Sequence, residues 1–152
     1  MTDAYRRTTA ETIEENKQLI LDANAVFSRG EFESFLSFFA DDFVFTLGGN
    51  VAIGESTVVG VDTFRSLLQQ GFSGNPEQGF NGKVTPLRFE IEQMICAGEY
   101  VTEIARGFGF TTEGRREYNN KYCRIWQIRN RKVISLIEFL DTAYFNKVVL
   151  EQ

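Results

Sequence analysis

The clearest candidate for chemistry in this sequence is Glu138, a single carboxylate within the apolar run at residues 133–140. Alternation along a strand puts it on one face with three apolar residues, Ile134, Leu136 and Leu140. A carboxylate on an apolar face is desolvated, which raises its pKa unless a cation lies beside it, and a raised pKa suits a general acid or base. An ion pair with Arg124, or a strand end that reaches solvent, would explain the same pattern.

Glu103 is the second candidate, in a predicted strand at residues 99–110. One face of this strand carries Glu103 and a series of small residues, Ala105, Gly107 and Gly109, whereas the other face carries bulkier residues. The bulkier side chains favour the second face as the one that packs in the core. The small residues beside Glu103, however, would leave room for a ligand on the first face. Alternation alone therefore leaves both orientations of Glu103 open.

The register of the last hairpin decides what lies beside Glu138. A two-residue turn at Asn130-Arg131 with regular pairing would put Glu138 opposite Cys123, and the apolar faces of the two strands would not match. An odd loop or a β-bulge restores the match and puts Glu138 opposite Tyr122 or Arg124. We favour the odd loop.

The composition narrows the possible chemistry. The chain has 15 phenylalanines and no histidine, which excludes a Ser-His-Asp triad, a Cys-His pair and histidine-bearing zinc sites. Acid–base catalysis must then use carboxylates, tyrosine, cysteine or lysine. Cys96 and Cys123 lie in separate apolar runs without metal-ligand spacing, so we expect no metal site and no cofactor. The net charge of −5 argues against a nucleic-acid partner.

The chain shows no apolar run of the ~20 residues needed to cross a bilayer. Its first eleven residues are polar, with no apolar segment typical of a signal peptide. We expect no membrane association and a cytoplasmic location.

The periodicity predicts helices first and a sheet second. A capping box at Thr8–Glu11 predicts a helix that begins near Thr8 and ends at Arg29-Gly30, so residues 1–10 are expected to be a flexible segment and residues 11–152 a single domain. A second helix should follow, with Phe32, Phe35, Leu36 and Phe39 at helical spacing, and should end at Asp41-Asp42. The remaining predicted elements are a strand at 43–47, an irregular strand or loop at 51–59, a helix at 62–70, a rim or lid loop at 71–82, and strands at 84–96, 99–110, 116–129 and 132–142. This order is typical of an α+β cone or half-barrel with one open end.

The same order resembles the nuclear transport factor 2-like superfamily and, within it, the SnoaL-like, ketosteroid-isomerase-related group. The segments that carry the resemblance are Phe39-Ala40-Asp41-Asp42-Phe43-Val44-Phe45, Tyr118-Asn119-Asn120-Lys121-Tyr122, Lys132-Val133-Ile134 and Glu138-Phe139-Leu140-Asp141-Thr142. The resemblance implies a curved antiparallel sheet wrapped into a cone, with three helices packed on its concave side and a hydrophobic pocket at the open end. It also implies a homodimer formed through the sheet and a hydrophobic small molecule as ligand or substrate.

No known catalytic set of this group matches completely. The aspartate base of steroid isomerases corresponds to Leu47. In the Asp–Arg–Asp arrangement of limonene-epoxide-hydrolase-like enzymes, the two acids correspond to Glu103 and Glu138, but the arginine corresponds to Val101. The tyrosine and asparagine that hold water in those enzymes correspond to Phe45 and Leu47. The same matching turns Glu103 inward and makes three residues face the cavity: Asn120, Tyr122 and Leu140.

Two functions remain open. The first is a cofactor-independent isomerase, cyclase or epoxide hydrolase acting on a polyketide-, terpenoid- or steroid-like substrate, with Glu138 and Glu103 as acid and base. In that site Asn120 and Tyr122 would orient a substrate oxygen, and the other expected substrate-binding residues are Phe45, Leu47, Ala105, Leu140 and Trp126. The second is a non-catalytic ligand-binding or dimerisation module, which is favoured if Glu103 points to solvent or Arg124 neutralises Glu138.

Overall fold

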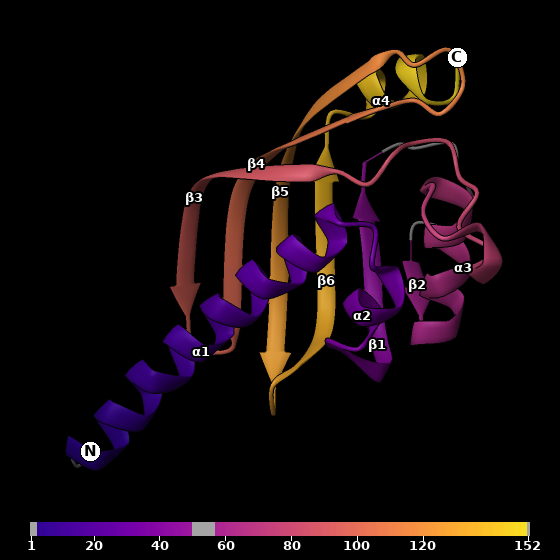
Figure 1. The fold of residues 1–152 in the computed structure, drawn as a ribbon. Coiled ribbons are helices and arrows are strands. Elements are labelled where there is room, and N and C mark those ends of the chain that lie inside the picture. The colour runs from indigo at the N-terminus through magenta and orange to yellow at the C-terminus, as the bar shows by residue number, and fades with distance from the viewer. Residues whose placement is uncertain (1–2, 50–56, 152) are drawn as a thin grey trace.

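One sheet with helices against it forms the protein (Figure 1), as seen in a computed structural model that describes residues 3–49 and 57–151. The strands lie in the order β2-β1-β6-β5-β4-β3. Their bounds are β1 Phe39–Gly48, β2 Thr57–Val59, β3 Arg88–Ala97, β4 Tyr100–Phe110, β5 Glu117–Arg129 and β6 Lys132–Leu140. The helices are α1 Asp3–Ser28, α2 Phe32–Leu36, α3 Val61–Gly71, the short 3-10 helix η1 Pro76–Gln78 and α4 Thr142–Val148.

The predicted α+β class and curved, unclosed sheet are confirmed. In Figure 1, α1 crosses one face of the sheet, and β4 and β5 bend at one end towards α4. Two details differ from the expectation. The pairing of β1 with β6 is parallel, so the sheet is mixed. The last strand ends at Leu140 rather than at residue 142, because the Asp141 side chain accepts a hydrogen bond from Tyr144 N at 3.0 Å and caps the additional helix α4.

The first two helices differ from the expectation at their ends. α1 begins at Asp3, and Thr8 lies inside it, because no glycine or proline at residues 3–7 stops the helix. The flexibility expected for residues 1–10 stays a prediction. α2 ends at Leu36 because Phe39 pairs with Val133 and starts β1 instead. Of the irregular segment expected at 51–59, residues 57–59 form β2, and residues 50–56 lie outside the described residues.

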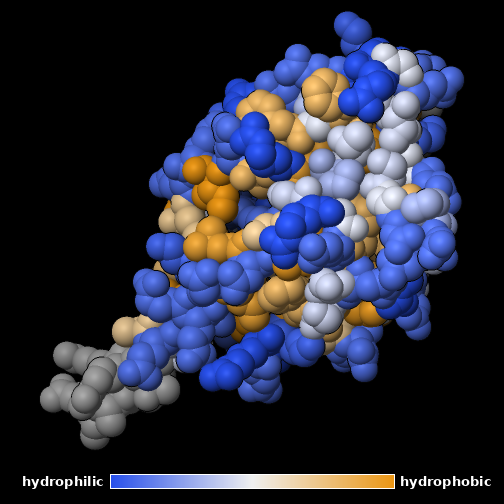
Figure 2. Space-filling view, in the orientation of Figure 1, coloured by the Kyte–Doolittle hydropathy of each residue, from blue (hydrophilic) through white to orange (hydrophobic). Residues whose placement is uncertain are grey.

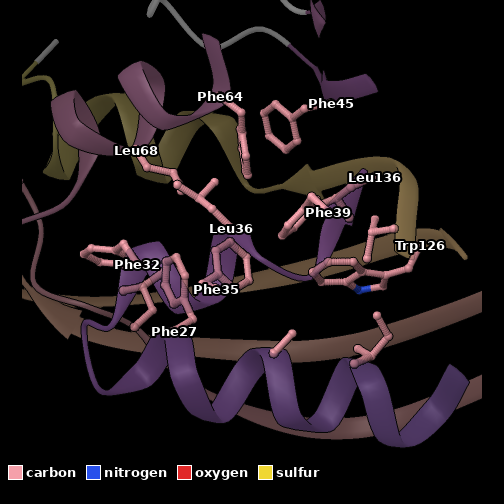
Figure 3. Packing of buried hydrophobic residues seen from close by; sticks show 14 of the residues in the cluster. Phe27, Phe32, Phe35, Leu36, Phe39, Phe45, Phe64, Leu68, Trp126 and Leu136 are labelled. Atoms are coloured by element: carbon pink, nitrogen blue, oxygen red, sulfur yellow. The ribbon is translucent and has the colours of Figure 1, made fainter. Parts of the chain in front are cut away.

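Phenylalanines fill the space between the helices and the sheet (Figure 3). Phe27 of α1 packs edge-on against Phe35 of α2, with ring centroids 5.0 Å apart. The ring centroid of Phe39 in β1 lies 5.5 Å from that of Phe64 in α3, so ring contacts join α1 to α2 and α3 to the sheet. Such pairs contribute about 0.5–1.5 kcal/mol each beyond the burial of their area. Most of the aromatic residues therefore pack in the core of the domain. Figure 2 shows that hydrophobic residues also reach its surface in patches.

The β5–β6 hairpin combines a tight turn with a bulge. Asn130 and Arg131 have φ values of 52° and 62° and form a two-residue turn between Arg129 and Lys132. The register then shifts, because Ile134 of β6 has no partner in β5. The odd loop that we favoured is wrong. The bulge instead restores the match between the two strands and pairs Glu138 with Arg124.

Among the described residues, no helix has the length and hydropathy needed to span a membrane.

Candidate active site

Three charged side chains lie at one level on the inner face of the sheet. Glu138 of β6 pairs with Arg124 of β5, which pairs in turn with Glu103 of β4. On the other side Glu138 pairs with Leu47 of β1. Because residues paired across neighbouring strands point to the same face, the register creates a row of acid, arginine and acid across three strands.

Glu103 is completely buried and lies on the inner face. Its Oε1 lies 2.5 Å from Arg124 Nη2 and accepts a hydrogen bond from Trp126 Nε1 at 2.8 Å. Its Oε2 accepts a hydrogen bond from Asn24 Nδ2 at 3.0 Å. Both carboxylate oxygens are thus engaged, and Glu103 does not line the cavity described below.

Arg124 is only 3% exposed and is held from several sides. Besides Glu103, its Nη2 donates to Asn24 Oδ1 at 2.7 Å, and its guanidinium carbon lies 3.7 Å from the centre of the Phe89 ring. We did not predict Asn24 as part of the site. The available signal was a polar residue on the apolar stripe of the first helix, beside Ala23 and Phe27.

A cavity of about 320 Å³ opens beside this row. Its lining is mostly apolar and aromatic, as is typical of small-molecule sites. Five predicted site residues line it: Phe45, Leu47, Tyr122, Glu138 and Leu140. Four others, Glu103, Ala105, Asn120 and Trp126, are buried on the same face of the sheet but do not line the cavity.

The small residues of β4 do not make room for a ligand, contrary to the expectation. A Cβ atom at Gly107 would lie 2.9 Å from the Tyr122 ring, and one at Gly109 would lie 2.8 Å from Thr85 Oγ1. Because glycine has no side chain, other side chains of the protein occupy the space beside these two residues. Gly107 therefore helps to seat Tyr122 against the sheet.

Tyr118 and Tyr122 form a hydroxyl pair at the cavity, with their oxygens 2.6 Å apart. Asn120 donates from Nδ2 to Tyr118 Oη and to the Asp141 carbonyl, each at 3.1 Å, and so ties the pair to the start of α4. Burial raises the pKa of both tyrosines above the usual value. Both hydroxyls therefore keep their protons at neutral pH and can donate hydrogen bonds.

Glu138 faces the cavity without a partner. It is half-buried, and among the described residues its carboxylate forms no hydrogen bond and no ion pair. Burial raises its pKa to about 7, against a smaller lowering by Arg124, and Glu103 adds a further increase. A carboxyl group with this pKa exchanges protons at neutral pH, as a general acid or base must.

The cavity also borders the loop expected to form a rim or lid at 71–82. Gly71 and Phe72, the first residues of this loop, line the cavity, together with Gln70 before the loop and Lys83 and Val84 after it. Within the part of the chain that the structure describes, no histidine, cysteine, aspartate or glutamate side chains cluster as they would around a metal ion.

Comparison with known proteins identifies the fold. A family model described as a SnoaL-like domain matches residues 20–136. A search of curated proteins finds no significant match. A nuclear transport factor 2-like protein of Burkholderia xenovorans is 21% identical, with a TM-score of 0.66 over 90% of this chain and 97% of that one.

Two further solved structures carry names that suggest an activity. A candidate isomerase of Bacillus subtilis is 10% identical, with a TM-score of 0.76 over 91% of this chain and 95% of that one. An epoxide hydrolase of the limonene-epoxide-hydrolase-like type from Mycobacterium tuberculosis is 14% identical, with a TM-score of 0.67 over 92% of both chains. At these identities the likeness concerns the fold alone.

Proposed function

The chain belongs to the SnoaL-like family of nuclear transport factor 2-like proteins, and we propose that it is a cofactor-independent enzyme that moves a proton on a hydrophobic, oxygen-bearing small molecule. Glu138 is the proposed base. The observation that carries the proposal is an unpaired carboxyl group with a pKa of about 7 in an apolar cavity. A carboxylate of a purely structural kind would be paired, as Glu103 is.

The tyrosine pair supplies the second part of the proposed site. The two phenols have two hydroxyl hydrogens, and one of them is used in the hydrogen bond between Tyr118 and Tyr122. Whichever tyrosine donates, the other hydrogen remains for a ligand, since it forms no hydrogen bond to another acceptor among the described residues. A substrate carbonyl at this point would be stabilised as negative charge develops on its oxygen.

The proposed reaction is proton removal next to a carbonyl group, followed by its return to the same carbon or to another one. Glu138 takes the proton from carbon, the electron pair moves onto the carbonyl oxygen, and the remaining tyrosine hydroxyl donates to that oxygen. Protonated Glu138 then gives the proton back. Glu103, which we expected to be the partner acid, is proposed instead to hold Arg124, and Asn120 to orient Tyr118.

The test is exchange of substrate hydrogen with D₂O. Incubating the protein with cyclic ketones and β,γ-unsaturated ketones of steroid and terpenoid size should give deuterium next to the carbonyl or a shifted double bond, which proton NMR detects. The rate should exceed that of buffer at the same pH. Binding of these compounds in a thermal-shift assay without any exchange would contradict catalysis and support the non-catalytic binding module.

Opening of an epoxide is a second candidate function, favoured by one observation. Glu103, Arg124 and Glu138 form an acid–arginine–acid row, although the arginine comes from β5 rather than from the position of Val101. Phe45 and Leu47 stand where a tyrosine and an asparagine would hold the water. Limonene oxide in the same panel separates the two reactions, because its hydrolysis yields a diol.

A homodimer is also proposed. The outer face of the sheet carries apolar residues such as Ile104 and Ile125, and Phe139 there is 47% exposed. A second copy packed on this face would cover them. Sedimentation equilibrium should give twice the chain mass of 17.4 kDa, and a mass of one chain at micromolar concentration would contradict the dimer. The cytoplasmic location expected from the sequence stays a prediction.

A further inference from the structure

Arg124 stands between two carboxylates, and the structure pairs it with only one of them. Its neighbours in the ladder are Glu103 on β4 and Glu138 on β6, both at its own level and on the inner face. Yet the guanidinium lies 2.5 Å from Glu103, and no ion pair joins it to Glu138 within the described residues. By sheet position alone either carboxylate is a possible partner, so something beyond the register selects Glu103.

The contacts that favour Glu103 come from two side chains. Asn24 of α1 bridges the pair, because its Nδ2 donates to Glu103 Oε2 and its Oδ1 accepts from Arg124 Nη2. Trp126 donates to the other oxygen of Glu103. Together they satisfy a fully buried carboxylate, which would otherwise be costly to keep in place. Glu138 accepts no hydrogen bond from any of the described residues.

We propose that Asn24 and Trp126 direct Arg124 to Glu103 and away from Glu138, and that this selection keeps Glu138 free for proton transfer. Asn24, Trp126 and Glu103 are thus positioning residues that act through Arg124. The inference rests on the proposed function for its meaning, but the pairing itself does not depend on any substrate.

The charged and titratable groups around Glu138 are few. Across the cavity lining, β5 contributes Arg124, Tyr118 and Tyr122, and the loop before β3 contributes Lys83. Glu103 of β4 lies behind Arg124, whereas β1, α3 and α4 contribute no charged side chain to the lining. Since the tyrosines stay protonated, Arg124 is the charged group with the largest effect on the pKa of Glu138, and that effect depends on where its guanidinium lies.

The experiment follows the titration of Glu138 by carbon NMR of carboxyl-labelled protein, with its signal assigned by its loss in E138Q. In E103Q the midpoint should fall by about one pH unit or more, because Glu103 no longer raises the pKa of Glu138 and because Arg124, without its counter-charge, should turn to Glu138. N24L keeps both charges and should lower the midpoint in the same direction by less. In E103Q/R124M no arginine remains, so the midpoint should not fall.

E99Q is the matched control. Glu99 also forms an ion pair with an arginine of β5, Arg129, at 2.9 Å, but this pair is exposed at the far end of the strands. Its loss should leave the titration of Glu138 unchanged. An unchanged midpoint in N24L, with circular dichroism showing folded protein, would overturn the inference. Failure to find a substrate would leave the titration readable, so the two proposals fail separately.

Discussion

Replacing Glu138 by glutamine is expected to slow proton exchange by about 10²- to 10⁴-fold, the range that a positioned general base contributes. Glutamine keeps the size and shape of the side chain but cannot take up the proton. Ligand binding, measured by thermal shift, should persist because the apolar lining is unchanged. E113Q is the control, since Glu113 lies exposed in the turn between β4 and β5. An E138Q variant with the wild-type rate would remove Glu138 from the mechanism.

The pH dependence of the same pair of proteins gives an independent check. With a folded-state pKa of about 7, Glu138 is ionised above neutrality, so kcat/KM of the wild-type protein should rise through pH 7 and then level off.

The stability of the folded protein should also depend on the titration of Glu138. The folded pKa lies above the ordinary value of 4.5, so the folded state binds the proton more tightly. Its stability therefore falls as pH rises from about 4.5 to 7, by at most about 3 kcal/mol. E138Q should escape this loss and be the more stable protein at pH 8 but not at pH 4.

Substitution of Glu103 by leucine is expected to have the largest effect on stability. E103L leaves Arg124 buried without its counter-charge and takes an acceptor from both Asn24 and Trp126. Removing one member of a buried ion pair costs about 3–5 kcal/mol. E103L/R124M carries no buried charge at this point and should recover most of the loss, because apolar replacement of a whole buried pair is often neutral.

Urea unfolding monitored by circular dichroism measures both proteins. A free energy of unfolding for E103L within about 1 kcal/mol of the wild type, the size of an ordinary substitution, would show that Arg124 finds another partner or water. The natural candidate for that partner is Glu138, and the titration described above would reveal it.

The sequence predicted the sheet well because strand alternation is a local property. The buried face of β5, from Tyr118 to Ile128, follows directly from it, and so does the inner position of Glu138. Local patterns failed where tertiary contacts decide. Phe39 has helical spacing but pairs with Val133, and the small residues of β4 accommodate protein side chains rather than a ligand.

The candidate site was predictable only in part for the same reason. Glu138 is an outlier in its own strand, so one segment is enough to find it. The partner of Arg124 depends on Asn24, which lies 79 residues before Glu103 in the chain. Nothing within a single strand could indicate which of two carboxylates the arginine would bind.

The bulge at Ile134 has a consequence for how this protein can evolve. Ile134 is the residue that the pairing with β5 skips, so a chain without it would still pair Glu138 with Arg124 and keep Glu138 on the inner face. The loss of one residue at the bulge is therefore tolerable, whereas a shift of the pairing itself by one residue would turn Glu138 to the outer face.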